Sequence, residues 1–127
     1  MIVIDASAAL LALLKAGDAR ANLELESVAV PHLADSEVAH ALRSQVLRGT
    51  VPEPQAAAAL ATWARLSVRR FPASGLLARI WELRQNLSGY DATYVALAEA
   101  LDTPLLTADA RLGTAPGPRC PITVVRG

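Results

Sequence analysis

Short apolar runs alternate with alanine- and leucine-rich segments along the whole chain. The runs have the length and β-branched content of buried strands, and the segments between them have the length and composition of helices. The expected strands are 1–4, 28–30, 68–71, 105–107 and 122–125. The expected helices are 6–14, 19–26, 52–66, 75–85 and 90–101, with one more that Asp35 or Ser36 caps and that runs to about Arg48. This alternation predicts an α/β fold with a central, mostly parallel sheet flanked by helices on both faces.

The length of the chain favours a single domain over residues 1–127. Because 53% of the residues are hydrophobic and only 4% are aromatic, the core must be built mainly from Ala, Leu, Val and Ile. The Pro- and Gly-rich segment 113–121 is expected to be a loop, since it is too short to separate two domains. Trp63 and Trp81 both fall at core-like positions of expected helices, so both are predicted to be buried.

Charge and cysteine content limit the partners and the compartment. The 12 basic and 12 acidic residues give a net charge of zero, so no global field attracts nucleic acid and any such binding must use local charge. Cys120 is the only cysteine, which excludes an internal disulfide and favours a reducing, cytoplasmic location. The N-terminal apolar run has no charged segment before it, and every apolar run is shorter than a membrane span. We therefore expect neither a signal peptide nor a membrane anchor.

Four carboxylates lie where a parallel α/β fold would bring them together. Asp5 and Asp109 follow expected strands, whereas Glu37 and Asp91 lie in the first turns of expected helices. Ligands of open parallel sheets bind beyond the carboxyl ends of the strands. We therefore expect these four side chains to meet at one edge of the sheet.

Each acid also has a structural explanation when it is considered alone. Asp5 and Asp109 are suited to cap the segments that follow them, Asp35 is suited to cap its helix, and Glu37 and Asp91 are favourable near a helix N-terminus. Held together, however, several carboxylates repel one another unless they are protonated or bind a cation. An all-oxygen set of ligands selects a hard cation such as Mg²⁺, with Mn²⁺ as the alternative.

Other chemistries lack their sequence patterns. There is no phosphate-binding Gly-x-x-x-x-Gly-Lys-Ser/Thr loop, no Gly-x-Gly-x-x-Gly and no Gly-x-Ser-x-Gly elbow. His32 and His40 are not spaced as a helical zinc pair, and His40 is expected on a helix surface. Nucleotide-cofactor, serine-hydrolase and zinc-enzyme functions are therefore unsupported.

Four segments occur in the order of a known family. They are Met1-Ile-Val-Ile-Asp-Ala-Ser-Ala-Ala-Leu10, Pro31-His-Leu-Ala-Asp-Ser-Glu-Val38, Tyr90-Asp-Ala-Thr-Tyr-Val-Ala-Leu-Ala98 and Leu106-Thr-Ala-Asp-Ala-Arg-Leu112. With these segments the chain resembles the PIN-domain ribonucleases, and specifically the VapC toxins of bacterial toxin–antitoxin modules. The resemblance covers essentially the full length and implies a PIN domain over 1–127.

The resemblance also implies a site. Its metal-binding and catalytic residues would be Asp5, Glu37, Asp91 and Asp109. Asp5 and Asp91 are the first choices as direct or water-mediated ligands, and the other two acids would complete the shell or orient the attacking water. Ser7 and Thr107 would be supporting hydroxyls, and the loop 86–88 would lie beside the site.

The implied activity is metal-dependent endonucleolytic cleavage of RNA by an activated water. The implied partners are an RNA substrate, a small DNA-binding cognate antitoxin and a second copy of the chain. Arg84, Arg111 and the Arg69-Arg70 pair are candidate phosphate contacts, with plain solvent exposure as the alternative. Leu10, Leu11, Leu13 and Leu14 crowd one early helix, where they either pack in the core or line a groove for a partner.

Two other functions remain open from the residues. A receiver-like, Mg²⁺-binding domain also clusters acids at strand ends, but it needs a lysine near the site and Lys15 is the only one in the chain. A non-catalytic binding module with PIN architecture is the other alternative. Four intact, mutually repelling acids argue against it.

Overall fold

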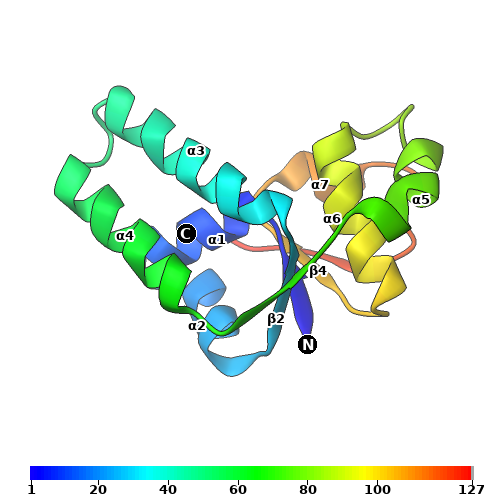
Figure 1. The fold of residues 1–127 in the computed structure, drawn as a ribbon, viewed down its shortest axis with the longest axis horizontal. Coiled ribbons are helices and arrows are strands. Elements are labelled where there is room, and N and C mark those ends of the chain that lie inside the picture. The colour runs from blue at the N-terminus through cyan, green and yellow to red at the C-terminus, as the bar shows by residue number, and fades with distance from the viewer. Residues whose placement is uncertain (127) are drawn as a thin grey trace.

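The computed structural model describes residues 1–126, which form a five-stranded parallel sheet covered by helices on both faces (Figure 1). The strands are β1 (Ile2–Ile4), β2 (Val28–Pro31), β3 (Val68–Phe71), β4 (Leu105–Thr107) and β5 (Ile122–Val124). The helices are α1 (Ala6–Leu14), α2 (Asp18–Leu25), α3 (Leu33–Leu47), α4 (Glu53–Arg65), the 3₁₀ turn η1 (Ser74–Leu76), α5 (Leu77–Glu82), α6 (Gly89–Ala100) and α7 (Ala110–Thr114). The predicted α/β class and parallel sheet are confirmed.

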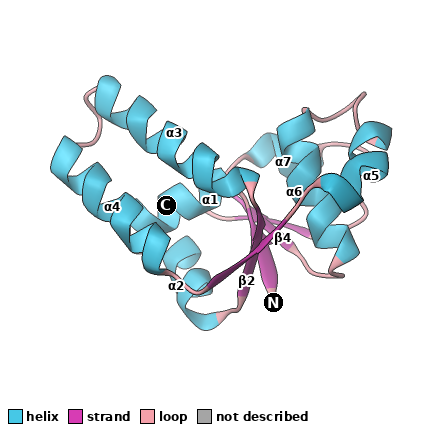
Figure 2. Ribbon diagram, in the orientation of Figure 1, coloured by secondary structure: helices cyan, strands magenta, loops and turns pink. Residues whose placement is uncertain are grey.

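The strand order β3-β2-β1-β4-β5 places the reversal of the chain between β1 and β4. Connections run outward from β1 through β2 to β3, and then return to the other side of β1. Since parallel crossovers are right-handed, this reversal moves the helices to the opposite face. Figure 2 shows the result, with α1 to α4 on one side of the sheet and α5 and α6 on the other. The sheet is therefore doubly wound.

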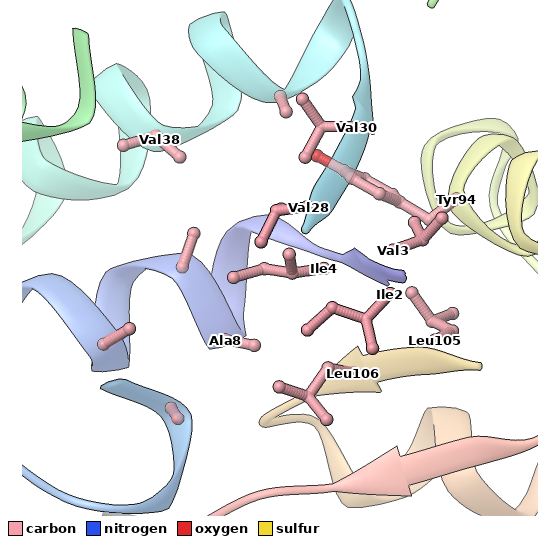
Figure 3. Packing of buried hydrophobic residues seen from close by; sticks show 14 of the residues in the cluster. Ile2, Val3, Ile4, Ala8, Val28, Val30, Val38, Tyr94, Leu105 and Leu106 are labelled. Atoms are coloured by element: carbon pink, nitrogen blue, oxygen red, sulfur yellow. The ribbon is translucent and has the colours of Figure 1, made fainter. Parts of the chain in front are cut away.

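The core lies on both faces of the two central strands. All three residues of β1 and of β4 are buried, as their continuously apolar sequences require. Alanines dominate the inner side of α1, and seven consecutive residues of α6 are buried. Figure 3 shows Tyr94 of α6 extending across β1 towards Val30 of β2. The low aromatic content is thus compensated by close packing of small side chains.

Most expected boundaries agree with the structure to within one or two residues. α1 and β3 have the expected ends, Ser88 caps α6 by accepting from the backbone N–H of Asp91 at 3.1 Å, and Asp109 caps α7. Gly49, with φ of 75°, adopts the left-handed conformation that stops α3, where other residues would be strained. The long helix expected over 75–85 is instead η1 followed by the short α5, and Ser74 provides no side-chain cap.

The start of α3 was predicted wrongly. The helix begins at Leu33, so Asp35 lies inside its first turn and caps nothing. Its carboxylate instead accepts from Trp63 Nε1 at 2.8 Å and from Arg70 Nε at 2.8 Å, and the guanidinium of Arg70 lowers the pKa of that carboxyl. Asp35 therefore joins α3 to α4 and β3. The earlier start also moves Glu37 from the first turn of the helix to the second.

The two tryptophans differ in environment. Trp63 is 2% exposed and belongs to the core, as expected. Trp81 is 67% exposed, so its predicted burial is wrong. Its indole lies on the outer surface of α5, where the guanidinium carbon of Arg84 is 4.5 Å from the ring centroid.

The early leucines pack against the core. Leu10, Leu11, Leu13 and Leu14 of α1 are partly buried against it. Leu10, Leu11 and Leu14 also line an open cavity of about 410 Å³, so the structure is compatible with both the core and the groove interpretations. Within residues 1–126, no helix has both the length and the apolar character needed to cross a membrane.

Candidate active site

The acids lie at the point where the sheet reverses direction. Asp5 directly follows β1. Asp109 lies two residues after the end of β4, the strand that pairs with β1 in the sheet. In doubly wound sheets the crevice beyond the carboxyl ends of two such strands is the usual ligand site. Asp91 reaches it from the first turn of α6, and Glu37 reaches it from α3. Four different elements thus contribute one carboxylate each.

Asp5 is held rigidly by the protein. The residue is 5% exposed. Its Oδ1 accepts from Ser7 Oγ at 2.6 Å and from the Ala8 N–H at 2.9 Å, and its Oδ2 accepts from Thr107 Oγ1 at 2.5 Å. The same carboxylate therefore caps α1 and anchors the centre of the site.

The two hydroxyls that contact Asp5 also shape the end of β4. Ser7 Oγ accepts from the Ala108 N–H at 2.9 Å, and Thr107 Oγ1 accepts from the Asp109 N–H at 3.0 Å. Ser7 and Thr107 therefore join the chain after β1 to the chain after β4. Both hydroxyls thus lie against Asp5, and their predicted role in support of a metal site stays a prediction.

Glu37 has a partner that the sequence analysis did not assign. Tyr94, on the buried face of α6, donates its hydroxyl to Glu37 Oε1 at 2.6 Å. Burial and this hydrogen bond raise the pKa of the Tyr94 hydroxyl, so it remains a protonated donor. The only sequence signal was its position three residues after Asp91, which places both side chains near one face of α6.

Asp91 and Asp109 line an open cavity of about 270 Å³. Asn86 and Ser88 form part of its wall, so the loop 86–88 lies beside the acids as expected. Arg111 also lines the cavity and pairs with Asp109, with Nη2 3.3 Å from Oδ2. The cavity therefore offers carboxylates, an amide, a hydroxyl and one guanidinium to a ligand.

The charges of the acids act on one another. Burial raises the pKa of the Asp5, Glu37 and Asp91 carboxyls, and in each case neighbouring carboxylates add to the shift. The hydrogen bond from Arg111 instead lowers the pKa of Asp109. Three of the four acids are thus in an environment that disfavours their charged form, and a cation would reverse this.

Within residues 1–126, no three His, Cys, Asp or Glu side chains are arranged closely enough to enclose a metal ion. Asp5 is directed to hydroxyls, Glu37 to Tyr94 and Asp109 to Arg111. The donor set nevertheless fits a hard cation in its chemistry, since every candidate ligand atom is a carboxylate oxygen. A bound cation would also relieve the repulsion between the neighbouring carboxylates.

The sequence matches the family model described as "PIN domain" over residues 2–117. The chain belongs to the PIN domain family. It is 55% identical over 125 residues to "Ribonuclease VapC9" of Mycobacterium tuberculosis (strain CDC 1551 / Oshkosh), with 98% of each chain covered. The VapC resemblance is confirmed by this likeness.

Solved structures share the PIN fold. A structure titled PAE2754, from Pyrobaculum aerophilum, superposes with a TM-score of 0.69 at 27% identity, over 95% of this chain and 81% of that one. A VapBC2 chain from Rickettsia felis, in a structure with a DNA fragment from their promoter, gives 0.69 at 15% identity, over 99% and 100%. These neighbours share the fold over 95% and 99% of this chain.

Proposed function

We propose that this PIN domain is a metal-dependent endoribonuclease and the toxin component of a toxin–antitoxin module. The observation that carries the proposal is the position of Asp5, Glu37, Asp91 and Asp109 at the β1–β4 reversal, where burial, helped by neighbouring carboxylates, raises the pKa of three of them. Asp91 and Asp109 also line an open polar cavity there. A relative 55% identical over nearly the full length bears the name ribonuclease, which supports the same activity here. RNA would enter through the cavity that Asp91 and Asp109 line.

The four acids would hold Mg²⁺, or Mn²⁺ as the alternative, which would neutralise phosphate charge and lower the pKa of a bound water. Asp5, fixed by Ser7 and Thr107, is the rigid element of this set. Asp91 presents its carboxylate to the cavity, where the scissile phosphate would lie. Because Tyr94 occupies Oε1 of Glu37, Oε2 is the atom that would accept a proton from the attacking water.

Replacing Tyr94 with phenylalanine should lower RNA cleavage about tenfold, because Glu37 loses the donor that orients it. The lost hydrogen bond should also reduce the free energy of unfolding by about 1 kcal/mol. Cleavage rate and urea denaturation measure the two effects. Tyr90→Phe is the matched control, since Tyr90 lies one turn earlier on α6 and is 64% exposed. Equal rates of RNA cleavage for both variants would show that Tyr94 does not contribute to the site.

The proposed partners follow from the same assignment. A small cognate antitoxin would neutralise the toxin and carry the DNA binding, and the toxin would form a homodimer in the cytoplasm. The Rickettsia felis structure is one of VapBC2 bound to a DNA fragment from their promoter, which supports such a pairing.

A receiver-like function is less well supported. Lys15 follows the last residue of α1, about 15 Å along the helix from Asp5 at 1.5 Å per residue. A lysine at that distance does not reach the acids. The alternative of a non-catalytic PIN module is tested by the following experiment.

Purified protein should degrade total RNA in Mg²⁺ or Mn²⁺, and EDTA should abolish the degradation because the acids alone cannot activate water. Asp5→Ala, purified identically, controls for contaminating nucleases and should show only background cleavage. Equal degradation in all three samples would refute the metal-dependent mechanism. Absence of cleavage with either metal would favour the binding module.

A further inference from the structure

Arg111 is the one basic residue among those that line the cavity beside Asp91 and Asp109. Its side chain is 93% exposed and lies where an RNA phosphate would have to approach the acids. The chain as a whole has no net charge, so no global field offsets the repulsion between that phosphate and the carboxylates. A cation at the entrance would offset this repulsion before the phosphate reaches the acids.

The present partner of Arg111 holds it weakly. Nε and Nη2 lie 3.3 Å from the two carboxylate oxygens of Asp109, which is long for charge-assisted hydrogen bonds. Exposed ion pairs are screened by water and contribute little. A phosphate accepts the same two N–H groups in the fork geometry that suits a guanidinium. Exchange of the carboxylate for a phosphate would therefore cost little.

The other candidate arginines are engaged elsewhere. Arg70 pairs with Asp35, and the guanidinium carbon of Arg69 lies 5.3 Å from the ring centroid of Phe71. Both arginines belong to β3, the edge strand at the opposite end of the sheet from β5. Arg84 donates Nη1 to the Trp81 carbonyl at 2.9 Å. Only Arg111 combines exposure, a weak partner and a place in the cavity wall.

We propose that Arg111 is a substrate-binding residue that transfers from Asp109 to a backbone phosphate of RNA as the substrate enters. Its Nε–H and one Nη–H donate to two non-bridging phosphate oxygens. The transfer frees Oδ2 of Asp109 for the acidic site, whereas Oδ1 still accepts from the backbone N–H of Arg111 at 3.0 Å. Arg111 therefore keeps Oδ2 occupied until RNA arrives. The inference rests on the proposed ribonuclease function, since it assigns the substrate contact of that same site.

The test measures RNA binding separately from cleavage. A short fluorescein-labelled single-stranded RNA is titrated with protein over a NaCl series, once in EDTA and once in Ca²⁺, and binding is followed by fluorescence anisotropy. Arg111→Gln should weaken binding about tenfold and reduce the slope of log affinity against log salt by about 0.7 to 1. Arg111→Lys should keep the slope and lose part of the affinity, because it retains the charge without the fork.

Arg65→Gln is the matched control. Arg65 is an exposed arginine in the last turn of α4, which lies on the opposite face of the sheet from α6. This variant should bind RNA with the affinity and salt slope of the parent protein. The same substitution at two exposed sites thus separates a phosphate contact from a general loss of charge.

Two results would overturn the inference. One is an Arg111→Gln variant with the parent's affinity and slope, and the other is a parent protein that binds no RNA in either EDTA or Ca²⁺. Either result removes the phosphate contact even if the parent cleaves RNA. Conversely, a parent that cleaves no RNA in Mg²⁺ or Mn²⁺, but whose binding still depends on Arg111, would refute the ribonuclease proposal and leave the phosphate contact standing.

Discussion

Replacing Asp91 with asparagine should lower the rate of RNA cleavage by about a thousandfold and leave the metal-free protein as stable as the parent or more stable. Asp91 lines the cavity, so its carboxylate would lie beside a substrate phosphate. An amide of the same shape removes the charge without leaving a void. Activity and stability should therefore respond in opposite directions.

The stability effect has a defined pH dependence. Burial, followed by the charges of Asp5 and Asp109, raises the pKa of Asp91 in the folded state. A carboxyl with a raised pKa stabilises the fold only while it is protonated, and this contribution is lost as pH rises through the raised value. The advantage of Asp91→Asn should therefore be absent below the ordinary carboxyl range, grow as pH rises through the shifted pKa, and then level off.

Thermal unfolding in EDTA across a pH series measures this advantage, and RNA cleavage in Mg²⁺ measures the loss of activity. Asp18→Asn is the control, because Asp18 is exposed in the first turn of α2 and distant in the fold from the acids. It should retain activity, and its stability should change by no more than about 0.5 kcal/mol. A markedly lower melting temperature for Asp91→Asn would show that Asp91 is a structural residue.

Replacing Trp63 with alanine should reduce the free energy of unfolding by about 3–5 kcal/mol. The side chain is 2% exposed, and its Nε1 donates to Asp35 Oδ1 at 2.8 Å. The substitution would leave a cavity between α3, α4 and the sheet, and would remove one donor from Asp35. Urea denaturation measures the change through the midpoint of unfolding.

Trp81→Ala provides the contrast. This tryptophan is 67% exposed and contacts Arg84, so its removal should cost no more than about 1 kcal/mol. Comparable losses for the two variants would contradict the assignment of Trp63 to the core and Trp81 to the surface. Both tryptophans were expected to be buried from the sequence, so the pair also tests the difference in burial that the structure shows.

The parts of the site that the sequence predicts well are those defined by local order. Asp5 and Asp109 each follow an apolar strand within two residues, and parallel strands carry such residues to one edge. Ser88 marks the start of α6 through its side-chain hydroxyl, and Gly49 marks the end of α3 through its left-handed backbone conformation. These features depend on a few neighbouring residues, so they can be predicted from a short segment of sequence.

Contacts between residues far apart in the chain could not be predicted from the sequence. Tyr94 meets Glu37 across 57 positions of sequence, and Arg70 meets Asp35 across 35. No local pattern indicates either pairing, because each depends on how separate helices and strands pack. The same limit explains the two tryptophans, since burial of a helical side chain depends on the length of its helix and on what covers it.

The hydrogen bond from Thr107 to Asp5 spans 102 positions of sequence, and the contact between Ser7 and Thr107 spans 100. During synthesis, the first of the four acids is made long before the hydroxyl that fixes it. A nascent chain that has reached only the end of α6 already contains Asp5, Glu37 and Asp91, but it lacks Thr107 and Asp109. The order of synthesis therefore delays the assembled site until β4 has paired with β1, so an incomplete chain that ends before β4 does not hold the four acids together.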